Sequence, residues 1–323
     1  MPLATPARSI EPASPAARIR FIDAHHHLWD PDTAPYPWMG SGARKFMGDT
    51  TPVCGRYLLA DFRQEASAVD LIGSVHLQCG RQPGDPVAET AWVAAQAQRA
   101  GFPIAIVGFC DLADPAAADI LARHSAFPAF RGVRHMLNWG EDQQYRLCER
   151  SDLMANPSWR RGFDALARHG LSFDLQVNAW QLADAAALAR AYPDTRIILN
   201  HAGLPIDRST EGLARWRDGI AALAACPNVD AKISGLGMTD PQWTEQSLRP
   251  IVETVIAAFG VERCMFGSNF PIDRLYAPYS RYMEVYRSLT AGFSAAARDA
   301  LFWRTAARAY RIDLPPAATG HLS

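Results

Sequence analysis

The chain has 323 residues, of which 49% are hydrophobic, and it carries a formal net charge of -1 at pH 7. This length suits either two ordinary domains or one α/β barrel. The chain lacks the basic excess that is typical of proteins binding nucleic acid or anionic membranes, so we expect neither partner. It also lacks an apolar stretch long enough to span a bilayer. A small-molecule substrate is therefore expected, and homo-oligomerisation stays open.

The two ends of the chain differ in composition from the rest. Residues 1–18 are rich in Pro, Ala and Ser and lack the apolar core of a secretion signal. We expect a poorly ordered leader over 1–18, one large domain over 19–314 and a tail over 315–323. The six cysteines are scattered without a Cys-x-x-Cys pair, which favours reduced thiols and a cytoplasmic location.

Short apolar runs alternate with helical patterns along the chain. Strand-like runs begin near residues 18, 69, 102, 130, 171, 195, 228 and 263. Helical patterns follow most of them, for example 85–101 with its Asp-Pro start, and 156–170 with Asn156 as its N-cap. About eight such units predict a (β/α)8 barrel. An open doubly wound sheet is the alternative, but the chain has no glycine-rich phosphate motif.

The first strand-like run ends in three consecutive histidines, in the stretch FIDAHHHLWDP over residues 21–31. Because side chains alternate along a strand, the odd-numbered residues of 21–27 should share one face. We assign that face to the barrel mouth and the even-numbered apolar face to the helix layer. This makes His25 and His27 candidates for binding a metal or stabilising an oxyanion, and His26 a packing residue.

Further polar side chains lie at predicted strand ends, where barrel enzymes build their sites. Candidates for binding an acidic or hydroxylated substrate are Gln78, Arg134, His135 and Lys232. A buried lysine or arginine needs an anionic partner or ligand. The long segment 30–57 follows the first strand, and we expect Trp38 within it to lie over the mouth and contact the substrate.

Six sequence blocks occur in a familiar order: IDAHHHLWDP, FRGVRHML, GLSFDLQV, IILNHAGLP, KISGL and RCMFGSNFP. Together they resemble the amidohydrolase superfamily, and within it the branch of sugar-lactone and 2-pyrone-4,6-dicarboxylate lactonases. The resemblance implies a (β/α)8 barrel that hydrolyses a small cyclic ester. It also implies that His25, His27 and His201 act in catalysis, and that they hold the metal if one is bound.

One position departs from the pattern of that branch. Its members carry an aspartate after the eighth strand, acting as general base or metal ligand, and that position is Asn269 here. A neutral amide cannot accept a proton at physiological pH. Asp273, four residues later, can take over only if the loop after Phe270 folds back. We therefore expect Asn269 and Asp273 both to belong to the catalytic site, with Asp273 or a histidine accepting the proton from water.

The metal content and two other functions stay open. The two-metal centres of the superfamily use a histidine or lysine on the fifth strand, which "FDLQV" lacks, so we expect no metal or one Zn²⁺. A zinc-dependent decarboxylase is an alternative within the same fold. A barrel that binds a ligand without turnover is a third hypothesis, because Asn269 could mark lost catalysis.

Overall fold

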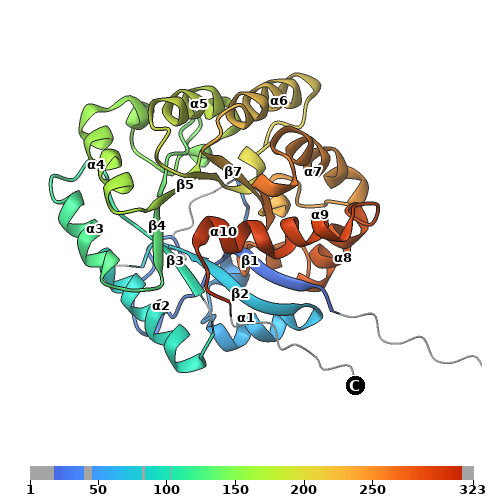
Figure 1. Cartoon of the computed structure of the whole chain (residues 1–323), viewed down its shortest axis with the longest axis horizontal. Helices are drawn as coiled ribbons and strands as arrows, with labels where there is room; N and C mark the ends of the chain where they lie inside the picture. Colours follow the sequence, from blue (N-terminus) through green and yellow to red (C-terminus); the bar gives the residue numbers. More distant parts are fainter. Residues whose placement is uncertain (1–17, 40–45, 82–83, 103, 315–323) are drawn as a thin grey trace, which may run out of the picture.

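The computed structural model describes residues 18–39, 46–81, 84–102 and 104–314. The leader predicted over 1–18, except Arg18, and the tail predicted over 315–323 lie outside these residues. Eight strands form one parallel sheet in the order β1 to β8, with helices around it (Figure 1). The predicted single-domain (β/α)8 barrel is therefore confirmed. No helix in the described ranges has the length and apolar character needed to cross a membrane.

The strands are β1 (Arg20–His26), β2 (Asp70–Leu77), β3 (Ile104–Gly108), β4 (Phe130–Met136), β5 (Ser172–Gln176), β6 (Ile197–Leu199), β7 (Val229–Ile233) and β8 (Cys264–Phe266). The α-helices are α1 (Leu59–Glu65), α2 (Val87–Ala100), α3 (Ala117–Ser125), α4 (Pro157–Arg168), α5 (Leu182–Ala191), α6 (Thr210–Ala224), α7 (Glu245–Phe259), α8 (Tyr279–Leu289), α9 (Ala295–Asp299) and α10 (Thr305–Tyr310). Helix α4 begins as predicted, because the Asn156 side chain accepts hydrogen bonds from the amides of Ser158 and Trp159.

The barrel closes between β8 and β1 through residues of the predicted site. The amide of Asn269 donates to the carbonyl of His25 over 2.7 Å, and the amide of His27 donates to the carbonyl of Phe270 over 2.8 Å. The histidine run and the segment after β8 are therefore held side by side by backbone hydrogen bonds.

Helix α10 covers the opposite, amino-terminal end of the barrel (Figure 1). Its Tyr310 is buried and donates a hydrogen bond of 2.7 Å to Asp174 of β5. Lys232 of β7 pairs with the same carboxylate oxygen over 2.6 Å. Apolar residues of β1, β2 and β3 pack around Tyr310 in the barrel interior, so this end of the barrel is filled and the carboxyl end of the strands remains for a site.

The alternation predicted for β1 is wrong in its first half. Ile22 and Ala24 pack in the barrel interior, whereas Asp23 accepts a hydrogen bond of 2.9 Å from Tyr279 of α8 in the helix layer. The pairing of β1 with β2 shifts register between Asp23 and His26. Such a bulge breaks the two-residue period of a strand. The prediction that all odd-numbered residues of 21–27 share one face therefore failed.

Candidate active site

A cavity of about 140 Å³ lies at the carboxyl end of the barrel. Polar residues from five parts of the fold line it: His27 after β1, Arg134 on β4, Gln176 on β5, His201 after β6 and Asn269 after β8. Its apolar lining includes Trp29, Trp38, Met47 and Met238. The cavity thus brings together polar residues that are up to 242 positions apart in the sequence.

Three of the predicted histidines form one cluster beside this cavity. The ring of His25 lies 5.1 Å from that of His27 and 4.3 Å from that of His201, measured between centroids. His25 is buried and neither of its ring nitrogens has a hydrogen-bond partner within the described chain. It lies outside the lining residues, so His27 and His201 are the two histidines that reach the cavity.

The hydrogen bonds of His27 determine which of its nitrogens can accept a proton. Its Nδ1 lies 2.8 Å from the carbonyl oxygen of Leu77. A carbonyl oxygen can only accept, so Nδ1 carries the proton, and in the neutral ring Nε2 is left as an acceptor. Burial lowers the pKa of His27 well below 6.5, and the nearby charge of Arg134 adds to this shift. His27 is therefore neutral at pH 7.

His201 is held in a strained turn. Its φ is +55°, and Ala202 and Leu204 also have positive φ, a conformation that L-residues rarely adopt. The Nδ1 of His201 contacts the hydroxyl of Ser234 over 3.1 Å. A Cβ on Gly235 would come within 2.4 Å of this nitrogen, so the ring fits only against glycine. Burial, followed by the charges of Arg134 and Lys232, lowers the pKa of His201 well below 6.5.

Arg134 supplies the positive charge at the cavity. Its guanidinium donates to the side chain of Gln176 over 2.9 Å and to the carbonyl of Gln78. Burial lowers its pKa from 12.5 to about 10, so it stays cationic at neutral pH. A buried cation fixed by neutral acceptors keeps its charge available for a ligand, because no carboxylate of the described residues is bonded to it.

The loop after β8 folds back and brings Asp273 to Asn269. This is the arrangement that Asp273 needs in order to take over from the aspartate expected at position 269. The side-chain amide of Asn269 donates to Asp273 Oδ1 over 2.7 Å, and the amide of Gly237 donates to Asp273 Oδ2 over 3.4 Å. Burial raises the pKa of Asp273 to about 7. Asn269 lines the cavity and Asp273 does not, so the carboxylate lies behind the amide.

Three of the predicted substrate-binding residues, Gln78, His135 and Lys232, do not line this cavity. Lys232 is fully buried in its ion pair with Asp174, and burial lowers its pKa to about 8. His135 follows Arg134 on β4 and points to the other face, where its Nδ1 accepts a hydrogen bond of 3.3 Å from Trp159 of α4. With Gln78 it lines a larger neighbouring cavity of about 730 Å³.

Trp38 does line the mouth cavity, as predicted for the segment after β1. Its ring packs edge-on against Trp29, with centroids 5.1 Å apart, and its Nε1 donates to the carbonyl of Cys79 over 2.6 Å. The segment is thereby attached to the end of β2 by a partly buried hydrogen bond.

The sequence places Gln176 at a predicted strand end without indicating its role, and the sequence interpretation missed Glu89 as a buried acid near the site. Glu89 is 6% exposed and lies on the stripe of α2 that also buries Val93 and Ala97. The sequence does contain a pattern that indicates burial of Glu89, because Glu89, Val93 and Ala97 recur every four residues and so lie on one helix face. A charged residue on an apolar stripe is rarely buried without a partner.

A zinc ion needs several donor atoms within a few ångström of one another. Among the described residues, the group whose donor atoms all lie within 4.8 Å of one another is His76, Cys79 and Glu89, and the predicted set of His25, His27 and His201 does not meet this spacing. In the group of His76, Cys79 and Glu89, the histidine Nε2 and the cysteine thiol both form hydrogen bonds with Oε1 of Glu89, which accounts for their short distances. The three predicted histidines therefore do not fit a zinc centre as they are arranged.

Comparison with known proteins identifies the family. The amidohydrolase family model matches residues 22–312. The chain belongs to the amidohydrolase family. The predictions of this family and of an enzyme are thereby confirmed.

Among the chain's relatives is y4mH of Sinorhizobium fredii, an uncharacterised protein that is 43% identical over 91% of this chain and 99% of its own length. An L-fucono-1,5-lactonase of Burkholderia multivorans is 32% identical over 91% of this chain and 97% of its own length.

Solved structures of an amidohydrolase from Burkholderia multivorans are also similar to this chain. One, with bound HEPES, is 30% identical with a TM-score of 0.77, and it covers 92% of this chain and 100% of its own. Another, with bound zinc, is 29% identical over the same shares with a TM-score of 0.76.

Proposed function

We propose that this member of the amidohydrolase family hydrolyses a small hydroxylated lactone, such as the lactone of a sugar acid. One observation carries the proposal: a neutral imidazole with a free Nε2, that of His27, lines the same small cavity as the buried cation Arg134. Ester hydrolysis needs an acceptor for the proton of water and a positive group for the oxyanion. The similarity to L-fucono-1,5-lactonases supports the substrate class.

The attacking water is held between two acceptors in this proposal. The side-chain Nδ2 of Asn269 donates to Asp273 Oδ1 and to the sulfur of Met238, so its Oδ1 is left to accept a hydrogen bond from the water. His27 Nε2 accepts the proton as the water oxygen bonds to the lactone carbonyl carbon. The carbonyl of Leu77, bonded to Nδ1, then stabilises the imidazolium that forms.

The carbonyl oxygen becomes negatively charged in this step. Arg134 faces it, and His201 donates through Nε2 when Ser234 gives its hydroxyl proton to Nδ1. When the tetrahedral intermediate collapses, the ring C–O bond breaks and the leaving alkoxide takes the proton back from His27. The product is the open hydroxy acid. Asp273 acts through Asn269 by fixing the orientation of its amide.

We further propose that this chemistry uses no resident metal. The spacing of the histidine nitrogens, described above, supports direct action of these side chains, and no step of the mechanism passes through a metal ion.

The proposed function is tested with the purified protein and a panel of sugar-acid 1,4- and 1,5-lactones. We expect release of acid, followed with a pH indicator, for at least one hydroxylated lactone. A panel without turnover beyond spontaneous hydrolysis would exclude the proposal, and release of carbon dioxide from hydroxybenzoic acids would favour the decarboxylase alternative.

A further inference from the structure

We propose that Glu89 is a positioning residue for the active site, holding the segment 77–81 in the conformation that orients His27, Arg134 and Trp38. This inference rests on the proposed function for its kinetic consequence, and its structural basis is independent of the substrate. Glu89 does not line the mouth cavity and acts through the backbone between it and the site.

Three consecutive carbonyl oxygens at the end of β2 each accept one hydrogen bond from a residue that lines the mouth cavity. The pairs are Leu77 with Nδ1 of His27 at 2.8 Å, Gln78 with the guanidinium of Arg134, and Cys79 with Nε1 of Trp38 at 2.6 Å. The base, the cation and the aromatic wall of the proposed site therefore share one short stretch of backbone as their acceptor.

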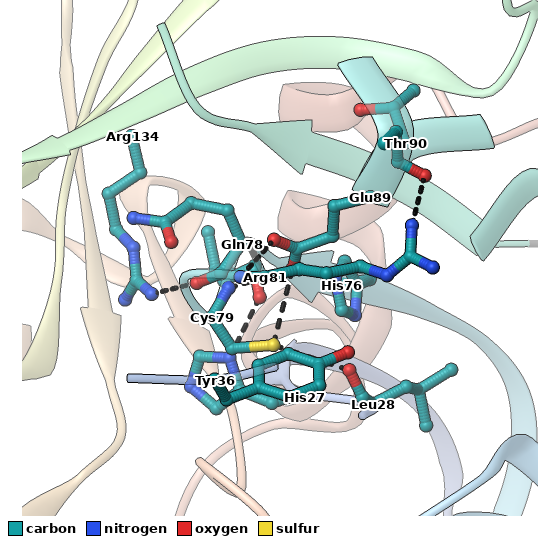
Figure 2. Close-up of polar contacts among 12 residues, drawn as sticks. His27, Leu28, Tyr36, His76, Gln78, Cys79, Arg81, Glu89, Thr90 and Arg134 are labelled. Atoms are coloured by element: carbon teal, nitrogen blue, oxygen red, sulfur yellow. Dashed lines mark hydrogen bonds and ion pairs between the residues drawn. The ribbon is translucent and has the colours of Figure 1, made fainter. Parts of the chain in front are cut away.

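The carboxylate of Glu89 holds this stretch from the other side, as Figure 2 shows. Its Oε1 accepts hydrogen bonds from the amide of Cys79 over 2.7 Å and from the thiol of the same residue over 3.2 Å. The same oxygen lies 3.1 Å from Nε2 of His76, and Oε2 accepts from the amide of Arg81 over 3.3 Å. A buried carboxylate with four such partners is a rigid anchor.

One peptide group connects Glu89 directly to Arg134. The amide that donates to Glu89 and the carbonyl that accepts from Arg134 belong to the peptide bond between Gln78 and Cys79. In a trans peptide the N–H and the C=O point in opposite directions. Fixing the N–H toward the carboxylate therefore points the carbonyl toward the guanidinium, and hydrogen bonding at one end strengthens the other.

The charge of Glu89 is maintained despite its burial. Burial raises its pKa, but the hydrogen bonds from His76 and Cys79 outweigh this, and the net shift is downward. A neutral amide in its place would bring two N–H donors among groups that are themselves donors, namely the amides of Cys79 and Arg81. The substitution Glu89→Gln therefore keeps the shape and removes the anchor.

The kinetic test compares Glu89→Gln with Asp230→Asn. Asp230 is also a fully buried carboxylate, but it pairs with Arg196 and Arg308 at the other end of the barrel. Because small misplacements of reacting groups cost about 10²-fold, we expect kcat/KM of Glu89→Gln to fall about 30- to 100-fold, mostly in kcat, with an altered acid limb of the pH profile. Asp230→Asn should stay within about 3-fold, whatever its loss of thermal stability.

A double-mutant cycle with Arg134→Lys tests whether Glu89 acts through the connecting peptide. Lysine cannot reproduce the guanidinium contact with the Gln78 carbonyl. If Glu89 works by orienting that carbonyl, Glu89→Gln should lower kcat/KM by a clearly smaller factor in the Arg134→Lys background than in the wild type. Equal costs in both backgrounds would mean a general structural role and would overturn the inference.

Hydrogen–deuterium exchange of residues 77–81 separates this inference from the proposed function. We expect at least about 10-fold faster exchange in Glu89→Gln and unchanged exchange in Asp230→Asn, with or without substrate. Unchanged exchange in Glu89→Gln would overturn the positioning role. Faster exchange in a protein that hydrolyses no lactone would overturn only the proposed function.

Discussion

The side-chain amide of Asn269 donates a hydrogen bond of 2.7 Å to the carboxylate of Asp273, and only the amide faces the mouth cavity. The neutral residue that replaces the expected aspartate is therefore oriented by a carboxylate behind it. In αL backbone, with φ of +59°, asparagine is one of the few non-glycine residues that fit well.

Replacing Asn269 should lower kcat by an amount that depends on the new side chain. We expect Asn269→Ala to lower kcat about 10- to 100-fold, because the attacking water loses an oriented acceptor. Asn269→Asp should retain more activity and add an ionisation to the pH profile, since two carboxyl groups this close share a proton. The measurement is kcat against pH for both variants, and full activity of Asn269→Ala would contradict the assigned role.

His27 is expected to be the proton acceptor. The substitution His27→Asn should lower kcat by about 10²- to 10⁴-fold, the range found for general acid–base groups. Because burial and Arg134 hold the pKa of His27 well below 6.5, wild-type kcat/KM should stay level as the pH falls through 6.5 and decline only in more acidic solution.

His124 provides the matched control for His27. It is a buried histidine of α3 that bonds Thr90 and the carbonyl of Phe109 and does not line the mouth cavity. His124→Asn should change stability and leave the pH profile of kcat/KM in place. An equal loss of kcat in both variants would argue against His27 as the base.

Arg134 should not be replaceable by lysine. Arg134→Lys keeps the charge but loses the planar fork that contacts Gln176 and the Gln78 carbonyl, so we expect kcat/KM to fall about 30- to 100-fold. Arg123, whose ion pair with Asp85 is exposed, is the control, and Arg123→Lys should retain wild-type kinetics. Steady-state kinetics on one lactone test both variants.

The buried histidines should make the fold sensitive to acid. Burial lowers the pKa of His25, His26, His27 and His201 well below 6.5, so below pH 6.5 the unfolded chain binds protons that the native state does not. Each such group removes about 1.4 kcal/mol of stability per pH unit. Asp23 and Asp273 act in the opposite sense, because burial raises their pKa to about 6 and about 7, but they are fewer.

His26 offers a direct test of this linkage. It stacks on Phe62 with ring centroids 4.1 Å apart, and neither ring nitrogen has a hydrogen-bond partner in the described chain. His26→Phe should reduce the loss of unfolding free energy between pH 6.5 and pH 5 by about 2 kcal/mol. Urea unfolding at the two pH values measures this difference, and an unchanged difference would show that His26 is protonated in the native state.

Metal removal should leave the enzyme active. We expect protein purified without chelator to contain well below one zinc ion per chain, and dialysis against a chelator to leave kcat unchanged. Elemental analysis beside the lactonase assay checks both points. Stoichiometric zinc, with activity lost on chelation and restored by zinc, would instead assign His25, His27 and His201 as ligands, consistent with the zinc bound in the related structure.

The sequence by itself determined the barrel and the chemistry available to it. Alternating apolar runs and helical patterns predicted the eight units, because burial periodicity is a local property. Asn156 and Pro157 at the start of α4 show the same locality, since a helix cap needs only neighbouring residues. The residue types of the site, including Asn269 for the expected aspartate, were also readable.

Only the tertiary structure decided which of these residues meet. The register shift in β1 placed Asp23 among the helices, and it depends on pairing with β2, which the local sequence does not encode. Lys232 does not line the mouth cavity because its side chain pairs with Asp174, and this partner is 58 positions away in the sequence. The hydrogen bonds that connect Glu89 to Arg134 pass through a third segment, so no spacing along the chain could reveal them.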